Sequence, residues 1–350
     1  MDQLIQHIRV AGLAAAVPRN EEKLAESEYG TPEARARFVA MTGIHARRLC
    51  LPEQFCSDLA VAAAERLLDD LAWDRAEVEN LILITQSPDL DRPSTACLIQ
   101  ARLGLPTTCA AFDINLGCSG YPYGLFVASK LTASRPGAKT LLLVGDAGGK
   151  YELATDRRTR SPLFGDAATA TALEWHPDAA PMRIQLHTDG SGWNTIMAPR
   201  AGGRPGLSAA DFRFEEREGE IHIHSPSRMQ GEDVFNFTAS TIPPAIRSML
   251  ASMDWSKESV DAFVLHQASR TVNDMLCKRI GVTVDRAPRS LEQFGNTNSA
   301  TIPLTLVTQW REKLRQSRQR LILCGYGIGL SWGTVACEWD RIVCPELIEI

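Results

Sequence analysis

The sequence lacks the features that mark membrane, secreted and metal-dependent proteins. No apolar run approaches the roughly 20 residues needed to cross a bilayer, and the nine cysteines include no CxxC pair and form an odd total. The N-terminal segment MDQLIQHIRVAGLAAAVP has neither a basic leader nor a clear small-residue cleavage site. We therefore expect a cytoplasmic protein with no membrane span, no disulfide framework and no metal site.

An excess of positive charge is also missing. The chain has 37 lysines and arginines against 42 aspartates and glutamates, for a formal net charge of −5. Such a balance gives no overall attraction to nucleic acid or to an anionic membrane, so neither is an expected partner. The 350 residues are otherwise ordinary in composition, with 44% hydrophobic residues. They predict a globular protein of one large domain or two smaller ones.

Short β-rich runs alternate with segments that have the apolar spacing of helices, and this alternation predicts an α/β fold. The predicted strands are residues 81–85, 110–114, 140–144, 262–265 and 321–324. The predicted helices are residues 59–71, 94–103, 121–133, 242–253, 268–280 and 302–316. Residues 187–220, rich in Gly, Pro, Ser and Arg, predict a long loop between them.

The order of these features occurs twice along the chain. The segment LILITQSPD near residue 81 resembles AFVLHQAS near residue 262, and each is a strand that leads into a polar turn. Cys118 follows Leu81 by 37 residues, and Asn296 follows Phe263 by 33 residues. The matched spacing predicts a duplicated architecture, with residues 1–175 as the N-terminal half and residues 176–350 as the C-terminal half.

Cys118 lies in a tight GCSG turn between the predicted strand 110–114 and the predicted helix 121–133. Its sulfur should face the positive end of the helix dipole and unpaired backbone N–H groups, which favour the thiolate. Considered alone, a cysteine is more often a buried structural residue than a nucleophile.

His266 ends the strand 262–265, and Asn296 lies in a Gly-Asn turn that leads into a helix. Each has a plain alternative, a satisfied polar histidine and a turn or cap asparagine. The repeat, however, brings Cys118 and Asn296 to equivalent turns, with His266 at the end of a neighbouring strand, where ligands of α/β sheets bind. We therefore predict that these three residues are catalytic and share one cleft.

At these residues the sequence resembles the β-ketoacyl-acyl-carrier-protein synthase III family of the thiolase superfamily. The matching segments follow the family order: TGIHARR at 42–48, GCSG at 117–120, FGDAATA at 164–170, TDGSGWN at 188–194, LHQAS at 265–269, FGNTNSATIP at 294–303 and YGIGLSWG at 326–333. The resemblance implies a thiolase-like α/β fold of two duplicated mixed-sheet halves with layered helices (αβαβα). It also implies a homodimer.

The resemblance further implies a reaction in two halves, without a cofactor. An acyl group from acyl-CoA or an acyl carrier protein is loaded on Cys118, in an oxyanion hole formed by the backbone N–H groups of Cys118 and Ile328. A malonyl thioester, expected to be malonyl-acyl carrier protein, then loses CO2, and His266 and Asn296 hold the enolate oxygen. Attack on the acyl group gives a β-ketoacyl thioester. The alternative is transfer of the acyl group from Cys118 to an alcohol or amine in a specialised pathway.

The sequence departs from the family where substrates are bound. Arg37 and Met41 replace the Trp and Arg that clamp coenzyme A, which favours an acyl carrier protein as the donor. Arg92 replaces a large apolar residue that reaches into the partner's acyl pocket. One interpretation is that Arg92 shapes the pocket for a polar, acidic or short acyl group. The alternative is that its side chain points to solvent. Ser269 and Gly327 are further expected substrate contacts.

The helix after His266 carries basic residues where the family meets its acidic carrier protein. Arg270, Lys278 and Arg279 are therefore the predicted docking residues for acyl carrier protein. The alternative is an ordinary solvated helix face.

Overall fold

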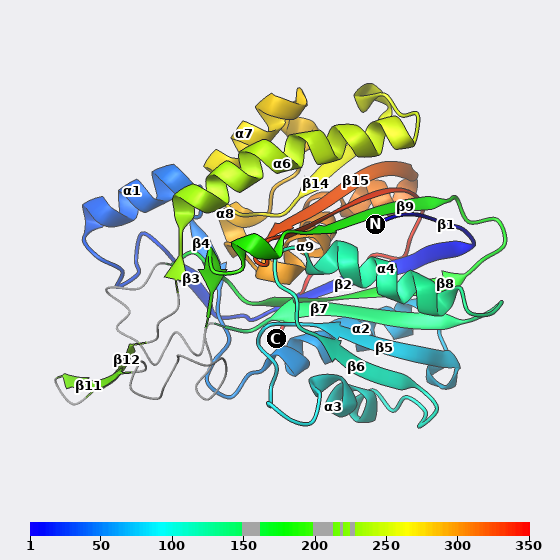
Figure 1. The fold of residues 1–350 in the computed structure, drawn as a ribbon. Helices are drawn as coiled ribbons and strands as arrows, with labels where there is room; N and C mark the ends of the chain where they lie inside the picture. The colour runs from blue at the N-terminus through cyan, green and yellow to red at the C-terminus, as the bar shows by residue number, and fades with distance from the viewer. Residues whose placement is uncertain (149–161, 199–212, 218–219, 225–227) are drawn as a thin grey trace.

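The structure, a computed structural model, describes residues 1–148, 162–198, 213–217, 220–224 and 228–350. Two mixed sheets dominate it (Figure 1). The first sheet, in spatial order, contains β17 (Ile348–Glu349), β2 (Ile8–Val17), β8 (Ala167–Trp175), β7 (Lys139–Asp146), β5 (Val78–Ile84) and β6 (Ala110–Ile114). The second contains β1 (Asp2–Ile5), β9 (Met182–Thr188), β16 (Ser331–Asp340), β15 (Arg318–Gly327) and β14 (Ala262–Leu265).

Helices and shorter strands complete the described part of the chain. The helices are α1 (Pro32–Thr42), α2 (Cys56–Leu71), α3 (Thr95–Arg102), α4 (Gly120–Thr132), α6 (Gly231–Ser252), α7 (Arg270–Ile280), α8 (Leu291–Phe294), α9 (Thr301–Gln309) and α10 (Arg311–Gln316). The strand pairs outside the two sheets are β3 (Glu21–Lys23) with β4 (Ala46–Arg48), β10 (Ile196–Met197) with β13 (Arg228–Met229), and β11 (Arg213–Arg217) with β12 (Glu220–His224).

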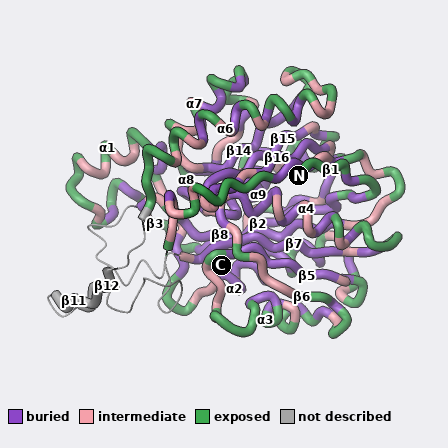
Figure 2. The backbone as a smooth tube through the Cα atoms, viewed as in Figure 1, coloured by how far each residue is buried: buried purple, intermediate pink, exposed green. Residues whose placement is uncertain are grey.

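Helices α4 and α9 lie between the two sheets. Leu125 of α4 and Leu304 of α9 belong to one buried cluster that also contains Leu142 of the first sheet and Leu323 of the second. Figure 2 shows this buried interior running along both sheets and the helices between them. The central layer therefore joins the two sheets into one core.

The outer faces of the sheets are also covered. Leu67 of α2 and Ile99 of α3 pack with residues of the first sheet, and Ile246 of α6 and Leu276 of α7 pack with residues of the second. The order helix, sheet, helix, sheet, helix confirms the predicted αβαβα layering (Figure 1). Within the described ranges, no helix is long and apolar enough to cross a lipid bilayer.

The apolar run in β5 follows from this layering. β5 pairs in parallel with β6 and β7, and packed helices cover both faces of its sheet. Leu81 and Leu83 face the outer cluster, whereas Ile82 and Ile84 face the central cluster. A strand buried on both faces needs apolar residues at consecutive positions, and this is the reason that the sequence shows a continuous run instead of alternation.

Three predicted boundaries were wrong. The helix predicted at 302–316 is two helices, separated at Trp310, whose indole N–H donates to Gln319 Oε1 at 2.8 Å. The helix predicted at 242–253 starts at Gly231, about three turns earlier. The loop predicted at 187–220 contains β10 and β11. β10 pairs with β13, which follows that segment, and β11 pairs with β12, which starts at its last residue. Residues 199–212 and 218–219 of that loop lie outside the described residues.

Each terminal strand belongs to the sheet that is formed mainly by the other half of the chain. β1, at the N-terminus, pairs with β9 of the second sheet, and β17, at the C-terminus, pairs with β2 of the first. The division of the chain at residue 175 coincides with the end of β8. It remains a prediction, and the exchanged terminal strands mean that neither half of the chain completes a sheet alone.

The central layer gives a first test. Leu304 is fully buried, so Leu304→Ala should lower the free energy of unfolding by about 2–5 kcal/mol in a denaturant titration, because it removes buried methyl groups and leaves a cavity. Val284→Ala is the control, since Val284 is 54% exposed and its truncation should have little effect. Equal effects of the two substitutions would contradict the central-layer assignment.

Candidate active site

The cysteine turn joins β6 to α4. Gly120 N–H donates to Gly117 O at 2.7 Å, which closes the turn around Cys118. Ser119 Oγ lies 2.6 Å from Ser331 Oγ, and both serines are buried. This bond fixes the start of the central helix against β16. The Cys118 sulfur is thereby held where the two halves of the chain meet.

A second loop, between β15 and β16, approaches the same sulfur. Gly327 has φ +151°, and a Cβ there would lie 2.9 Å from Cys118 Sγ, so only glycine fits. Ile328 O accepts a hydrogen bond from Ser331 Oγ at 2.8 Å. The backbone N–H groups of Ile328 and Cys118 both act on the sulfur and lower its pKa. These are the two groups predicted to form the oxyanion hole, and that role remains a prediction.

The protonation of Cys118 differs from the expectation. Burial raises the pKa of its thiol to about 11, against the opposing effect of the two N–H groups, and the charge of Asp146 raises it further. The predicted thiolate was therefore wrong for the protein without substrate. Desolvation of this partly buried side chain outweighs the helix terminus, and the thiol form of Cys118 is favoured at pH 7.

His266 follows β14 and is 2% exposed. Its Nδ1 lies 2.7 Å from Thr301 Oγ1, and the Tyr326 hydroxyl donates to His266 O at 3.2 Å. Burial lowers the pKa of His266 to about 3, so the imidazole is neutral at physiological pH. A neutral imidazole can donate one N–H without adding a charge to the site.

Thr301 connects the tautomer of His266 to the following loop. Thr301 Oγ1 lies 3.1 Å from Asn298 O and can donate to it. In that arrangement Nδ1 carries the ring hydrogen, and Nε2 is an acceptor. When the Thr301 hydroxyl turns to donate to Nδ1, Nε2 carries the hydrogen and becomes a donor. The pair can therefore supply either a lone pair or an N–H.

Asn296 lies in the loop between α8 and α9 and is 5% exposed. Its backbone N–H donates to Leu163 O at 2.9 Å, and its C=O accepts from Gly165 N–H at 3.1 Å. Asn296 Oδ1 accepts from Asn298 N–H at 2.9 Å. Because the amide oxygen is used in this way, the side-chain NH2 is the group left for a substrate oxygen.

Sequence reasoning missed the residue that connects these three. Asn298 Oδ1 lies 3.4 Å from Cys118 Sγ, and its backbone contacts Asn296 Oδ1 and Thr301 Oγ1. Its side-chain NH2 contacts Asp146 and Gln86. The available signal was the second asparagine of GNTN, which is a residue that tolerates the left-handed conformation found here, with φ +52°.

The predicted substrate contacts have different positions. Gly327 adjoins Cys118, as described above. Ser269 is the N-cap of α7, where its side chain accepts from Val272 N–H at 3.3 Å. Arg37 on α1 and Arg92 before α3 are exposed in the single chain. Their proposed roles toward an acyl carrier and a partner's acyl pocket remain predictions.

The predicted docking residues differ in their contacts. Arg270 donates to Ala40 O of α1, and Arg279 donates to Ala239 O of α6 at 2.8 Å. Both guanidinium groups therefore take part in packing between helices. Lys278 is exposed on α7, and it is the member of the set best placed to meet a partner.

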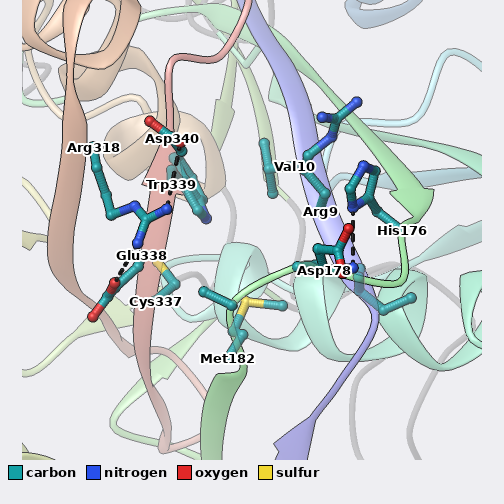
Figure 3. A pocket seen from close by; sticks show the side chains of 13 residues that line it. Arg9, Val10, His176, Asp178, Met182, Arg318, Cys337, Glu338, Trp339 and Asp340 are labelled. Atoms are coloured by element: carbon teal, nitrogen blue, oxygen red, sulfur yellow. Dashed lines mark hydrogen bonds and ion pairs between the residues drawn. The ribbon is translucent and has the colours of Figure 1, made fainter.

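A separate cavity of about 270 Å³ lies beside β2 and β16 (Figure 3). Both arginines in its lining have acidic partners, since Arg9 pairs with Glu174, and Arg318 pairs with Glu338 and Asp340. None of the three predicted catalytic residues lines it. The candidate chemistry therefore stays at Cys118.

A thiol between two backbone N–H donors, a neutral imidazole and an oriented amide, held between two mixed sheets, define a condensing enzyme of the thiolase fold. The sequence matches the model for 3-oxoacyl-[acyl-carrier-protein] synthase III over residues 112–190 and the model for the C-terminal part of that enzyme over residues 250–339. The comparisons with whole proteins agree with this class.

The β-ketoacyl-[acyl-carrier-protein] synthase III of Synechococcus sp. (strain RCC307) is 31% identical over 343 residues, which are 95% of this chain and 98% of the relative. The crystal structure of a 3-oxoacyl-(acyl-carrier protein) synthase from Burkholderia xenovorans LB400 has a TM-score of 0.89 and 32% identity, and covers 100% of this chain and 99% of that one. The chain belongs to the β-ketoacyl-acyl-carrier-protein synthase III family, a family of acyl-transferring condensing enzymes.

The buried imidazole predicts a pH dependence of stability. The pKa of His266 is about 3 in the folded protein and about 6.5 when exposed. The unfolded chain therefore binds the additional proton, and stability is lost as the pH falls below 6.5. The slope approaches about 1.4 kcal/mol per pH unit.

Denaturant titrations of the native protein and of His266→Gln at pH 7.5, 6.0 and 5.0 measure this dependence. The variant should lose about 2 kcal/mol less than the native protein between pH 7.5 and 5.0, because glutamine does not titrate. Identical pH profiles would mean that His266 is not held in a buried neutral state.

Proposed function

We propose that this protein carries an acyl group on Cys118 and condenses it with malonyl-acyl carrier protein, with loss of CO2, to give a β-ketoacyl thioester. The observation that carries the proposal is the arrangement at Cys118. Two backbone N–H groups converge on the sulfur, and Asn298 connects it to His266 and Asn296. A nucleophile and two sets of oxyanion donors are what such a condensation needs.

In the loading step, Cys118 Sγ attacks the carbonyl carbon of an acyl thioester. The carbonyl oxygen becomes negative and takes the N–H groups of Cys118 and Ile328, which face the sulfur in the free protein. The new C–S bond forms as the donor's C–S bond breaks, and the proton of Cys118 ends on the departing thiol. Each such N–H donor typically contributes about 2.7–4 kcal/mol to stabilising the transition state.

In the condensation step, the malonyl thioester loses CO2 and leaves an enolate. The neutral imidazole of His266 and the side-chain NH2 of Asn296 can both donate to its oxygen. Neutral donors suit this task, because they stabilise the negative charge without transferring a full proton to it. The enolate carbon then attacks the acyl carbonyl, and Cys118 leaves as the thiolate and recovers a proton.

Delivery of both substrates by an acyl carrier protein is part of the proposal. Arg37 and Met41 lie exposed on α1, and neither offers an aromatic ring on which an adenine could stack. Lys278 offers a positive charge to an acidic carrier. The reaction requires no cofactor beyond these substrates.

We also propose a homodimer in the cytoplasm. β6 is the edge strand of the first sheet, and its Phe112 and Ile114 are only half buried in the single chain. Leu98 of the neighbouring α3 is 39% exposed. Pairing of β6 with its copy would cover this edge. All nine cysteines are thiols, which suits a reducing compartment.

Release of CO2 separates the two candidate reactions. Incubation of the acylated protein with malonyl-acyl carrier protein should release one CO2 for each β-ketoacyl thioester formed. Asn296→Ala should still accept the acyl group but should condense about 10²–10³-fold more slowly, because it loses an oxyanion donor. Acyl transfer to an alcohol or amine without CO2 would instead support the alternative, and would contradict the condensation.

Docking of the carrier has its own test. Lys278→Glu should raise KM for malonyl-acyl carrier protein several-fold with little change in kcat, because it places a negative charge before an acidic partner. Lys130→Glu, an exposed lysine on α4, is the matched control. An unchanged KM for Lys278→Glu, or an equal change in both variants, would count against docking at α7.

A further inference from the structure

We propose that Asn298 is a positioning residue that holds Cys118 as an oriented neutral thiol and joins it to His266 and Asn296. The proposal deepens the proposed function, because it concerns the same nucleophile. Asn298 lies in the short helical turn Asn298–Ala300 that precedes α9. Each side of this residue, side chain and backbone, contacts a different part of the site.

The side-chain amide of Asn298 has only one chemically reasonable orientation. Its NH2 donates to Asp146 Oδ2 at 2.9 Å and to Gln86 Oε1 at 3.2 Å. The carboxylate oxygen of Asp146 cannot donate to an amide oxygen, and Gln86 directs its own NH2 to Asn115 Oδ1, so both contacts use the NH2 of Asn298. Oδ1 must face Cys118 Sγ, 3.4 Å away. The sulfur consequently meets an acceptor, and an acceptor favours S–H over the thiolate.

Asp146 holds Asn298 in this orientation. It is 6% exposed at the end of β7, and it accepts hydrogen bonds from Gln86 N–H and Ser299 Oγ, both at 2.7 Å. Burial raises its pKa, and these donors oppose that effect. The Ser87 and Thr85 hydroxyls each lie 3.3 Å from Oδ1 of Asp146, so the carboxyl group is surrounded by donors. These bonds hold Asp146 in place as an acceptor for the NH2 of Asn298.

Asp146 is also the charged group that acts on the nucleophile. Its charge raises the pKa of Cys118. Tyr326, on β15, interacts with the sulfur, and burial raises the pKa of its hydroxyl, so it is neutral at pH 7. His266, which contacts Asn298 through Thr301, is also neutral, because burial lowers its pKa. An acidic side chain behind an amide, with no cation among these groups, favours the protonated sulfur.

The backbone of Asn298 reaches the other two catalytic residues. Its N–H donates to Asn296 Oδ1 at 2.9 Å, and its C=O lies 3.1 Å from Thr301 Oγ1, which in turn contacts His266 Nδ1. This geometry uses a φ of +52°, a conformation that asparagine tolerates better than most residues do. One residue therefore sets the positions of all three.

These contacts imply that a bound thioester is needed before Cys118 reacts. In the free protein, the sulfur donates to Asn298 and receives the N–H groups of Cys118 and Ile328. An acyl carbonyl that enters the oxyanion hole takes those N–H groups for its own oxygen. Those N–H groups then stabilise the negative carbonyl oxygen, and the proton of Cys118 passes to the departing thiol as the new C–S bond forms. Without a bound thioester, Cys118 stays an unreactive thiol.

The test is the pH dependence of Cys118 alkylation by iodoacetamide in the substrate-free, full-length protein, followed by peptide mass spectrometry at Cys118. Asn298→Gly keeps the left-handed backbone and removes the acceptor. Its alkylation midpoint should fall by about 0.5–1 pH unit relative to the native protein, the effect of losing one hydrogen bond to the thiol. Water that enters the space left by the side chain would also lower the midpoint, so the result is compared with a variant that keeps this space filled.

Asn298→Asp is the second variant. It keeps the shape and an acceptor oxygen but replaces the NH2 that faces Asp146 by a second carboxyl oxygen. The added acidic group disfavours a further negative charge on the sulfur, so the midpoint should equal or exceed that of the native protein. An unchanged midpoint in Asn298→Gly, or a lowered one in Asn298→Asp, would overturn the proposal. Because the assay uses no acyl donor, it stands apart from CO2 release, and failure of the condensation would leave this result intact.

Discussion

The close approach of the Cys118 turn to the backbone of β15 is the constraint on which the rest of the structure depends. A Cβ on Gly325 would lie 2.8 Å from Cys118 O, and a Cβ on Gly327 would lie 2.9 Å from its sulfur. The bond between Ser119 and Ser331 fixes this approach. The layers of helices around the two sheets supply the packing that brings the two halves of the chain to this distance. Without it, the oxyanion donors would not face the nucleophile.

Burial then determines the charges of the site. The same exclusion of water that strengthens hydrogen bonds to a developing oxyanion keeps Cys118 as a thiol and His266 as a neutral imidazole. Asp146 is the buried carboxylate of this network, and its hydrogen bonds come from neighbouring donors. The site is therefore organised to receive a negative charge that appears only during the reaction.

The sequence predicted the α/β fold and singled out Cys118, His266 and Asn296 because both depend on local patterns and on order along the chain, and the layering came from the family resemblance. The catalytic roles of the three residues remain predictions. The apolar runs of β5 and β14 and the GCSG and GNT turns are such patterns. It did not predict the break at Trp310 or the start of α6, because tertiary contacts determine them. It also missed Asn298 and Asp146, since their roles arise from contacts between positions about 150 residues apart in the chain. The high pKa of Cys118 depends on burial, which a helix-terminus argument does not include.

The central claim is that one acyl group is carried on Cys118. Peptide-mapping mass spectrometry after incubation with a panel of acyl-CoAs and acyl carrier proteins tests it most directly. We expect a single added acyl group on the peptide that contains Cys118, and none on that peptide in Cys118→Ala. An acyl group on a different residue, or equal labelling of the Cys118→Ala protein, would show that Cys118 is not the acyl carrier.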